Sequence, residues 1–465
     1  MKNQKCKQIR NILLPALLGL PGVAAHSQPE SHPNMVLFMA DDCTYFDIGC
    51  YGSKDSKTPN IDKFASEGML FTKGYQSAPM SSPTRHNLYT GIWPVKSGAY
   101  PNHTMADTGT LSIVNHLKSG GYRVALIGKS HVLPNSVFPF EYVDLTATND
   151  IDFNAVDTFI YSCTSKKQPF CLFVTSNQPH KPWNKGDPSR FNPKSLHLPP
   201  YYVDIPETRN ELCKYFAEIN YMDAEFGKLL GYIDQYKIKE NTVVLFLSEQ
   251  GNSMPFAKWT LYDAGVHSAY IVRWPGKIKA GSVSDAIVEY VDITPTFCEM
   301  ANVKPLAPVD GISILPVLLG KTNEHKQYTF SLQTTRGIIK GSEYFGIRSV
   351  ADKKYRYIVN LTPEASFNNA ESNGELFRIW KELGKTDSIA AYITYRYQHR
   401  PAVELYDTEN DPYCINNLAA KPEYSAIIAR LEKSLKDWMQ YCGDKGQETE
   451  MEALNHMPGR IIQNE

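Results

Sequence analysis

The sequence has almost no excess of either charge. Its 465 residues include 48 lysine and arginine residues against 49 aspartate and glutamate residues, which leaves a formal net charge of -1 at pH 7. Such a balance provides no electrostatic basis for binding nucleic acid or an anionic membrane surface. An anionic ligand therefore has to be bound by a local cluster of positive groups. The length exceeds what one small core needs, and it favours a large domain with a smaller one.

The chain also lacks an apolar run long enough to span a bilayer. Residues 12–24 are apolar, but the run is short and is interrupted by Pro15 and Pro21. Basic residues precede this run and Ala25-His26-Ser27 follows it as a small-x-small cleavage site, a pattern typical of a secretory signal. No cysteine follows the run, so a lipoprotein anchor is not indicated. The pattern predicts a cleavable signal peptide over residues 1–27 and a periplasmic or secreted protein without a membrane span.

CxxC pairs are absent, as are internal repeats and low-complexity linkers, so zinc or redox motifs of that kind are unsupported. Of the nine cysteines, Cys6 leaves with the signal peptide. Export permits disulfides among the other cysteines, with Cys414 and Cys442 or Cys163 and Cys171 as possible pairs. The alternative is that several of them are buried free thiols.

Four short, continuous apolar runs predict strands that are buried on both faces, as in the sheet of an α/β protein. The runs are residues 34–40, 123–127, 170–176 and 242–247. Each run is followed by polar side chains, which are Asp41 and Asp42, Lys129 and His131, His180, and Glu249 and Gln250. Ligands of open α/β sheets bind at the carboxyl ends of the strands. We therefore expect these side chains to line one crevice.

The adjacent carboxylates of Asp41 and Asp42 indicate a cation site. Two neighbouring carboxylates repel each other unless a cation neutralises them. Hard oxygen ligands of this type suit Ca²⁺ or Mg²⁺ rather than zinc. For an isolated pair of this kind, a solvated turn is the alternative.

The segment SSPTRHNLYTG, residues 81–91, predicts a helix that begins at or next to Ser81. Pro83 suits the first turn of a helix, where its missing N–H would be unpaired in any case. The free N–H groups and the dipole of a helix start favour an anion. Arg85 lies one turn beyond Ser81, so its guanidinium can point back towards the hydroxyl. These features suit a tetrahedral oxyanion, and an ordinary surface helix capped by serine is the alternative.

The same segment resembles the signature of type I sulfatases, Cys/Ser-x-Pro-x-Arg followed by Leu-x-Thr-Gly. The resemblance implies that Ser81 is oxidised after translation to formylglycine, whose hydrated aldehyde is the nucleophile. Serine in place of cysteine at this position implies maturation by the oxygen-independent anaerobic sulfatase-maturating enzyme of bacteria.

The resemblance further implies one bound Ca²⁺, with Asp41 and Asp42 among its ligands. Glu249 and Gln250 take the place of the aspartate and asparagine that most sulfatases have in Ser-Asp-x-Gly. Each of these two side chains is one methylene longer, so either the metal lies further out or the loop retreats. The ligand chemistry, a carboxylate and an amide oxygen, is preserved.

Cationic residues of the family motifs have counterparts in this sequence. Lys129, in the element Gly-Lys-x-His, and Lys258 correspond to the two lysines that bind the sulfate. Arg85 is implied to hold the hydrated aldehyde together with the metal. These groups would stabilise the oxygens around sulfur during in-line attack.

Histidines complete the implied set of catalytic residues. His180 is retained from the family pattern His-x-Pro-His, whereas Asn177 replaces the first histidine, and His180 is implied to protonate the leaving oxygen or nitrogen as general acid. His131 is implied to help deprotonate the second hydroxyl, so that sulfate leaves. His103 is a candidate for binding the sugar, as are aromatic residues of the C-terminal part. We interpret His267 as a packed structural residue.

Similarity to sulfatases extends over roughly residues 33–440 and implies their alkaline-phosphatase-like α/β fold. In that fold a large mixed sheet is sandwiched by helices, and a smaller C-terminal α+β subdomain has an antiparallel sheet. We expect a catalytic domain over residues 28–335, a C-terminal subdomain over residues 336–442 and a polar tail over residues 443–465. An amphipathic helix is predicted over residues 207–236, with its apolar stripe in the core.

The implied activity is hydrolysis of sulfate from a sulfated oligosaccharide, such as a glycosaminoglycan or mucin glycan. Residues 128–142 and 348–418 are most similar to heparan N-sulfatase (sulfamidase)-like members, whereas residues 249–259 resemble bacterial carbohydrate O-sulfatases. One rival is a phosphatase or phosphodiesterase of the related alkaline phosphatase superfamily, in which an unmodified serine or threonine attacks phosphorus. The other is a non-catalytic glycan-binding homologue, in which Ser81 is never oxidised.

Overall fold

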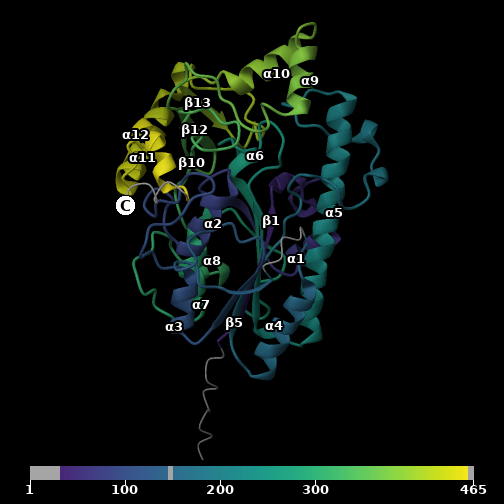
Figure 1. Ribbon diagram of the computed structural model, residues 1–465, viewed down its shortest axis with the longest axis vertical. Helices are drawn as coiled ribbons and strands as arrows, with labels where there is room; N and C mark the ends of the chain where they lie inside the picture. The colour runs from purple at the N-terminus through teal and green to yellow at the C-terminus, as the bar shows by residue number, and fades with distance from the viewer. Residues whose placement is uncertain (1–31, 145–149, 459–465) are drawn as a thin grey trace, which may run out of the picture. The chain divides into compact units, whose positions relative to one another are not determined.

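The computed structural model describes residues 32–144 and 150–458 (Figure 1). The predicted signal peptide over residues 1–27 lies outside the described residues. Among the residues described, one mixed sheet has nine strands, and a second sheet has four. The larger sheet has the order β4-β3-β5-β1-β6-β7-β2-β8, with β9 paired to β2.

The four predicted strands are neighbours in the larger sheet. They are β3 (Arg123–Gly128), β5 (Phe170–Thr175), β1 (Asn34–Asp41) and β6 (Thr242–Glu249), in that spatial order. All three pairings between them are parallel. The carboxyl ends of these strands therefore meet at one edge of the sheet, as the sequence predicted.

The remaining strands make the sheet mixed. Strand β7 (His267–Arg273) runs antiparallel to both β6 and β2 (Met69–Tyr75). The edges are formed by β4 (Glu141–Asp144), β8 (Ser282–Ser284) and β9 (Val288–Glu289).

Helices cover both faces of this sheet because its central strands are apolar on both sides. In β1, Val36 and Phe38 belong to one buried cluster, and Leu37 and Met39 belong to another. Figure 1 shows α5 along one face and α2, α3 and α7 along the other. The first face carries α1 (Pro59–Ser66), α4 (Phe153–Ser165) and α5 (Pro206–Gln235). The second carries α2 (Ser81–Thr90), α3 (Ile113–Ser119), α7 (Ile293–Met300) and α8 (Leu315–Leu318).

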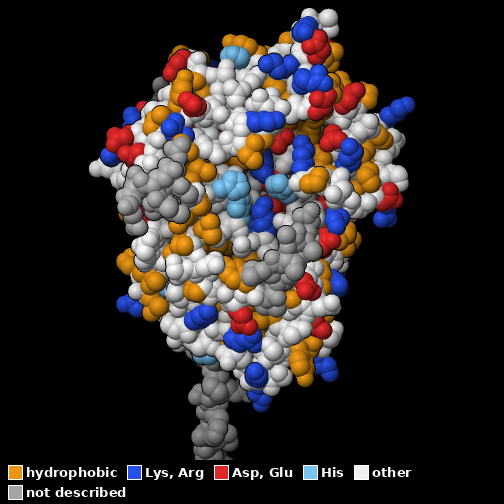
Figure 2. Space-filling view, in the orientation of Figure 1, with side chains coloured by type: hydrophobic (Ala, Val, Ile, Leu, Met, Phe, Trp, Pro, Cys, Tyr) orange, Lys and Arg blue, Asp and Glu red, His pale blue; other side chains and the backbone are white. Residues whose placement is uncertain are grey.

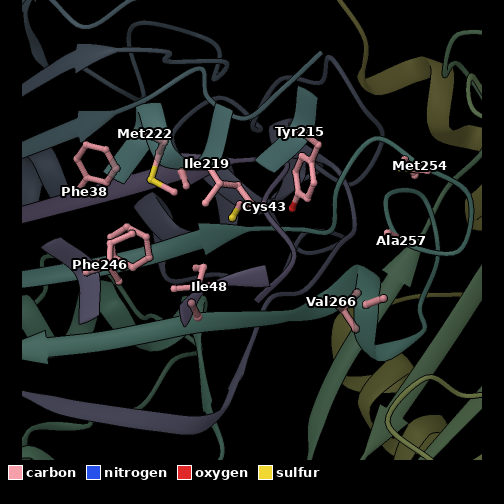
Figure 3. Close-up of a cluster of buried hydrophobic side chains, with 14 of the residues drawn as sticks. Phe38, Cys43, Ile48, Tyr215, Ile219, Met222, Phe246, Met254, Ala257 and Val266 are labelled. Atoms are coloured by element: carbon pink, nitrogen blue, oxygen red, sulfur yellow. The ribbon is translucent and has the colours of Figure 1, made fainter. Parts of the chain in front are cut away.

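The long helix α5 packs as its apolar stripe predicted. Ile219 and Met222 lie over Phe38 and Phe246 of the sheet (Figure 3). The ring centroids of Phe38 and Phe246 are 5.9 Å apart in a stacked arrangement. Burying one such side chain contributes about 1.5–3 kcal/mol. Similar contacts recur along α5 and hold this helix against the sheet whose strand ends carry the polar side chains.

Short helical turns occupy several of the connections. One is the α-helical turn α6 (Asp263–Val266), and the others are 3-10 helices at Tyr45–Asp47, Gly49–Tyr51, Pro188–Arg190, Pro193–Ser195, Lys239–Asn241, Tyr290–Asp292, Pro422–Tyr424 and Ala453–His456.

The smaller sheet belongs to the C-terminal part of the chain and is antiparallel throughout. Its strands are β10 (Thr329–Gln333), β11 (Ile347–Ala351), β12 (Tyr355–Asn360) and β13 (Val403–Asp407). The helices of this part are α9 (Glu375–Leu383), α10 (Ser388–Gln398), α11 (Ser425–Cys442) and α12 (Gln447–Glu452). The antiparallel sheet expected in the C-terminal part is therefore present. Because β10 already pairs with β11, this sheet begins before the expected boundary at residue 336.

The chain after residue 442 is not the polar tail that we expected. Residues 447–456 form α12 and a 3-10 turn, and Glu450 is fully buried, where it accepts a hydrogen bond from the backbone N–H of Thr335 at 2.8 Å. Tyr100 Oη donates to the carbonyl of Thr449 at 2.8 Å, and Met105 N donates to the carbonyl of His456 at 2.9 Å. Polar side chains therefore serve here as buried hydrogen-bonding groups. Residues 459–465 lie outside the described residues.

Every cysteine among the described residues is a free thiol, and all except the half-buried Cys50 are buried. The candidate disulfides between Cys414 and Cys442 and between Cys163 and Cys171 are not formed, which leaves the buried-thiol alternative. Within residues 32–144 and 150–458, each helix is too short or too polar to cross a lipid bilayer.

Candidate active site

Helix α2 begins at Ser81, at the edge of the sheet where the parallel strands end. Met80 before it is extended, and the N–H of Thr84 donates to the carbonyl of Met80 at 3.3 Å, which closes the first turn around Pro83. Gly91 ends the helix with a φ of 67°, a left-handed conformation that glycine adopts without strain. Ser81 is only 4% exposed. The helix start is therefore an internal feature, which contradicts the alternative of a surface helix.

The hydroxyl of Ser81 contacts groups from three strand ends. Ser81 Oγ donates to Asp41 Oδ1 at 3.0 Å. Lys129 Nζ and Gln250 Nε2 each lie 3.4 Å from the same oxygen, as donors. A carboxylate after β1, an ammonium after β3 and an amide after β6 thus converge on one hydroxyl, as expected from the positions of these residues in the sequence.

Arg85 faces Glu249 rather than Ser81, which differs from the orientation expected from helical spacing. Its Nε donates to Glu249 Oε1 at 3.3 Å, and its Nη2 donates to Glu249 Oε2. Arg85 Nη1 donates to the carbonyl of Lys129 at 2.7 Å. Asp41 Oδ1 lies 3.8 Å from Arg85 Nη2, so Asp41 lies between the guanidinium and the hydroxyl of Ser81. Glu249 and Arg85 are both fully buried, so the charge-assisted hydrogen bonds between them are strong. These bonds direct the guanidinium to Glu249 instead of Ser81.

Asp42 is the second centre of the site. Its Oδ2 accepts hydrogen bonds from Lys258 Nζ at 2.6 Å and Ser253 Oγ at 2.5 Å. Its Oδ1 accepts from Gln250 Nε2 at 2.5 Å. His180 Nε2 lies 3.5 Å from Asp42 Oδ2. The structure therefore brings His180 and Lys258 to the same carboxylate.

Electrostatics keep Asp41 and Asp42 ionised. Burial opposes ionisation, but nearby cations, led by Lys129, hold the pKa of Asp41 well below its ordinary value. Burial also tends to raise the pKa of Asp42, but Lys258 outweighs it, and the pKa of Asp42 is lowered as well. Burial raises the pKa of Glu249 to about 7, although Arg85 opposes this shift.

The oxygens in this region fit a hard divalent cation. Asp41 and Gln250 contact the hydroxyl of Ser81, and Asp42 contacts Gln250. Gln250 Oε1 is buried without a hydrogen-bond partner among the described residues. Asp42 and Gln250 have φ values of 57° and 44°, a backbone strain that often accompanies functional sites. In the described residues, no group of three or more histidine, cysteine, aspartate and glutamate side chains is arranged as a metal site. The donor set is all oxygen and includes an amide, which matches the chemistry of Ca²⁺.

A cavity of about 620 Å³ opens above Ser81. Figure 2 shows histidine and basic side chains gathered around a hollow on this face, with acidic side chains beside them. Six of the predicted residues line the cavity, namely Ser81, His103, Lys129, His131, His180 and Lys258. Two lysines and three histidines thus line the cavity together with Ser81, and such a wall favours an anionic ligand.

His103 and His131 lie against each other in the cavity wall. His131 Nε2 is 2.9 Å from His103 Nδ1, and both residues have a positive φ, 56° for His103 and 52° for His131. Burial lowers the pKa of His131 well below its ordinary value, and Lys129 adds to the effect. Burial and the same lysine lower the pKa of His103. Both imidazoles are therefore neutral at physiological pH.

Other cavity residues were not found from the sequence. Asn102, Lys181, Trp259 and Glu371 also line the cavity. Lys181 could have been noticed because it adjoins His180, but Glu371 lies 190 positions away from Lys181 and has no motif around it. Aromatic residues were expected from the C-terminal part, yet its contribution to the cavity wall is Ile339, Ala370 and Glu371.

His267 is a packed residue, as the sequence suggested. It is buried, its Nδ1 lies 3.2 Å from Asp263 Oδ2, and its ring stacks on Tyr45 with centroids 3.7 Å apart.

Comparison with known proteins identifies the family. The sulfatase family model matches residues 33–303, more than half of the chain, and this range contains the strand ends and the whole of α2. The chain belongs to the sulfatase family. Sulfatases are hydrolases of sulfuric esters, so the resemblance seen in residues 81–91 is confirmed. A second family model, described as N-sulphoglucosamine sulphohydrolase, C-terminal, matches residues 251–389 of this sulfatase.

Individual relatives of this sulfatase agree with that assignment. An ulvan-active sulfatase of Formosa agariphila is 32% identical over 423 residues, which are 89% of this chain and 81% of that protein. The N-sulphoglucosamine sulphohydrolase of Homo sapiens is 24% identical over 462 residues, 87% of this chain and 89% of that protein. A solved structure of a protein bound to its substrate D-glucosamine-2-N,6-O-disulfate superimposes with a TM-score of 0.69 at 19% identity, covering 90% of this chain and 99% of that one. This likeness confirms the expected alkaline-phosphatase-like fold.

Proposed function

We propose that this sulfatase hydrolyses sulfate from a sulfated glycan, with residue 81 as the nucleophile. The observation that carries the proposal is the position of Ser81 Oγ, which lies between Asp41, Lys129 and Gln250 at the base of a basic cavity. The ulvan-active and N-sulphoglucosamine-specific names of the relatives support a carbohydrate substrate.

Residue 81 would act in oxidised form. Formylglycine at this position, once hydrated, would supply a hydroxyl that attacks sulfur and a second hydroxyl that allows sulfate to leave. Asp41 Oδ1 accepts the proton of the present hydroxyl at 3.0 Å and fixes its direction. The guanidinium of Arg85 in turn restrains Asp41 and Glu249. These contacts would restrain the side chain of residue 81, which lines the cavity.

Asp41, Asp42, Glu249 and Gln250 would hold one calcium ion. When bound, this ion would neutralise the carboxylates and polarise the oxygen ligands of sulfur. Gln250 would contribute its buried Oε1, which has no partner among the described residues.

The lysines would bind the transferred sulfate. Lys129 Nζ lies 3.4 Å from Ser81 Oγ, and Lys258 Nζ is fixed by Asp42 at 2.6 Å. Both side chains line the cavity, so a sulfate that approaches Ser81 meets an ammonium from each of them. Oriented charges of this kind stabilise the oxygens on which negative charge develops.

Histidines would move protons in this reaction. His131 Nδ1 is buried without a hydrogen-bond partner among the described residues, and it can accept a proton from residue 81. His103, 2.9 Å from His131 Nε2, would fix that ring and contact the sugar. His180 Nδ1 lies 2.6 Å from the carbonyl of Lys181, which orients the ring so that Nε2 faces Asp42 and can carry a proton to the leaving group.

Replacing His180 by glutamine tests the assignment of the general acid. His180→Gln is expected to lower kcat for a sulfated sugar by about 100- to 10,000-fold, because the sugar oxygen or nitrogen leaves poorly without a proton. The loss should be much smaller for 4-nitrophenyl sulfate, whose leaving group is a stable anion. His197→Gln is the control, since His197 is an exposed histidine paired with Asp55. An equal loss with both substrates would contradict the role of His180.

Calcium binding can be measured without turnover. Addition of CaCl₂ to the chelator-treated protein is expected to raise Tm, since a ligand present at 100 times its Kd stabilises the folded state by about 2.7 kcal/mol. Asp42→Asn and Gln250→Leu should weaken this shift because each removes a proposed oxygen ligand. A calcium-dependent shift of the same size in both variants would show that the ion binds elsewhere.

The activity itself is tested on protein produced together with an anaerobic sulfatase-maturating enzyme. Mass spectrometry of the peptide that contains residue 81 should show the loss of two hydrogens. Sulfate release is then measured on N-sulfoglucosamine, glucosamine 6-sulfate and ulvan oligosaccharides, with a sugar phosphate as comparison. Faster release of phosphate than of sulfate would favour a phosphatase. Lack of both modification and turnover in protein from the native host would favour a glycan-binding homologue.

We also expect the chain to be exported to the periplasm or secreted, in line with the pattern of residues 1–27.

A further inference from the structure

The cavity above Ser81 adjoins a second cavity of about 490 Å³. The wall that both cavities share is formed by Lys181 and Glu371, whose Nζ and Oε2 are 3.2 Å apart. The first cavity is the sulfate cavity described above, and the second is called the acidic cavity here. A sugar with its sulfate over Ser81 would meet this ion pair if it extended towards the acidic cavity.

The two cavities differ in the charge of the side chains that line them. Glu371 is the one carboxylate that lines the sulfate cavity among the described residues, where its partner Lys181 and the other lysines and histidines also line the wall. The charged residues that line the acidic cavity are Lys181, Glu207, Glu211, Lys214, Glu371 and Glu375. Lys214 is paired with Glu211 at 2.6 Å, and Glu375 is paired with Arg378 outside the cavity. Glu207 has no ion pair among the described residues, so the acidic cavity retains net negative charge.

Glu371 is held in place rather than mobile. Its backbone N–H donates to Asn369 Oδ1 at 3.0 Å, and Asn369 Nδ2 donates to Tyr397 Oη at 2.9 Å. Asn369 is fully buried, and the side chain of Glu371 is 13% exposed. These bonds hold the backbone, and the ion pair with Lys181 at 3.2 Å restrains the carboxylate. A group that interacts with this carboxylate therefore does not have to order it first.

We propose that Glu371, together with Lys181, is a specificity-determining pair that admits a neutral or cationic part of the sugar beyond the sulfate and disfavours a second sulfate or a carboxylate there. This inference rests on the proposed sulfatase activity. A fixed carboxylate accepts hydrogen bonds from hydroxyl or ammonium groups and repels anions. The repulsion between like charges is stronger at a protein surface than in bulk water, because the effective dielectric constant is lower there.

Binding tests the inference independently of turnover. The unmodified chain with Ser81 is titrated calorimetrically with N-sulfoglucosamine and with D-glucosamine-2-N,6-O-disulfate, in buffers of low and high salt. The parent chain is expected to favour the monosulfated sugar, and the ratio of the two Kd values should shrink as salt screens the charges. Glu371→Gln should shift that ratio about tenfold towards the disulfated sugar, a change of about 1.4 kcal/mol. Lys181→Met, which leaves Glu371 without its partner, should shift it in the opposite direction.

Control variants show whether a change in the ratio of the two Kd values is specific to Glu371. Glu382 lies on α9, the helix that follows Glu371 in the chain; it is exposed, is paired with Lys385 and lines neither cavity, so Glu382→Gln should leave the ratio unchanged. Glu371→Lys should favour the disulfated sugar more strongly than Glu371→Gln does. Unchanged ratios in both Glu371 variants, each with a parental Tm, would overturn the proposal. Altered binding ratios without sulfate release by the matured enzyme would instead overturn the proposed function.

Discussion

Ser81→Ala is expected to abolish sulfate release from every sulfated sugar while leaving the fold almost unchanged. Loss of a covalent nucleophile costs about six orders of magnitude in kcat in well-studied hydrolases. The substitution removes only one hydroxyl, which donates to Asp41 Oδ1 and lies 3.4 Å from Lys129 Nζ and Gln250 Nε2. A single hydrogen bond contributes about 0.5–1.5 kcal/mol, so Tm should fall only slightly.

The neighbouring serine provides a matched control for this experiment. Ser82 is buried in the same helical turn, and its Oγ accepts a hydrogen bond from Thr104 N at 3.4 Å, away from the sulfate cavity. Ser82→Ala should retain modification at residue 81 and sulfate release. Both variants are assayed by ion chromatography of released sulfate and by thermal unfolding. Near-parental turnover of Ser81→Ala would refute residue 81 as the nucleophile.

Arg85→Met is expected to cause the largest loss of stability among substitutions in the site. The guanidinium is fully buried between Glu249, Asp41 and the carbonyl of Lys129. Its removal leaves buried negative charge without compensation, which costs about 3–5 kcal/mol. Urea unfolding of the unmodified protein measures this loss directly, without dependence on activity.

A second substitution separates the loss of the ion pair from a general packing defect. Glu249→Gln removes the uncompensated charge, so Arg85→Met combined with Glu249→Gln should be more stable than the sum of the two single effects predicts. The exposed pair of Arg378 and Glu375 is the surface control, where Arg378→Met should cost at most about 1 kcal/mol. Additive effects of Arg85→Met and Glu249→Gln would contradict direct coupling between the two side chains.

Much of the fold was predictable because its central strands are buried on both faces. Such strands appear in the sequence as continuous apolar runs, and residues 34–40 and 242–247 were identified for that reason. Their polar ends then predicted which side chains meet, since parallel neighbours end at the same edge. The roles of those side chains came from motifs, not from the runs themselves.

What could not be predicted depends on contacts between distant parts of the chain. Helical spacing places Arg85 near Ser81, but the guanidinium turns to Glu249 because a buried carboxylate from β6 is the stronger partner. Glu371 reaches the sulfate cavity from the segment before α9, and its local sequence gives no sign of this. The buried Glu450 falls in a stretch whose composition predicts a polar tail, because composition does not reveal that backbone N–H groups satisfy its carboxylate.

The last turn that the structure describes is hydrogen-bonded to the loop that carries His103. These contacts have a consequence for how the protein forms during synthesis. The carbonyl of His456 accepts hydrogen bonds from Met105 N and Thr104 Oγ1, and Thr449 binds Tyr100. During translation the residues that make these hydrogen bonds, 449 and 456, are added after all the strands and after the side chains to which we assign catalytic roles. A nascent chain that has already emerged as far as α11 therefore still lacks the support for one wall of its cavity. Premature termination after residue 442 would leave the sulfatase motifs intact in the sequence. It would remove the hydrogen bonds that hold the loop of His103 in place.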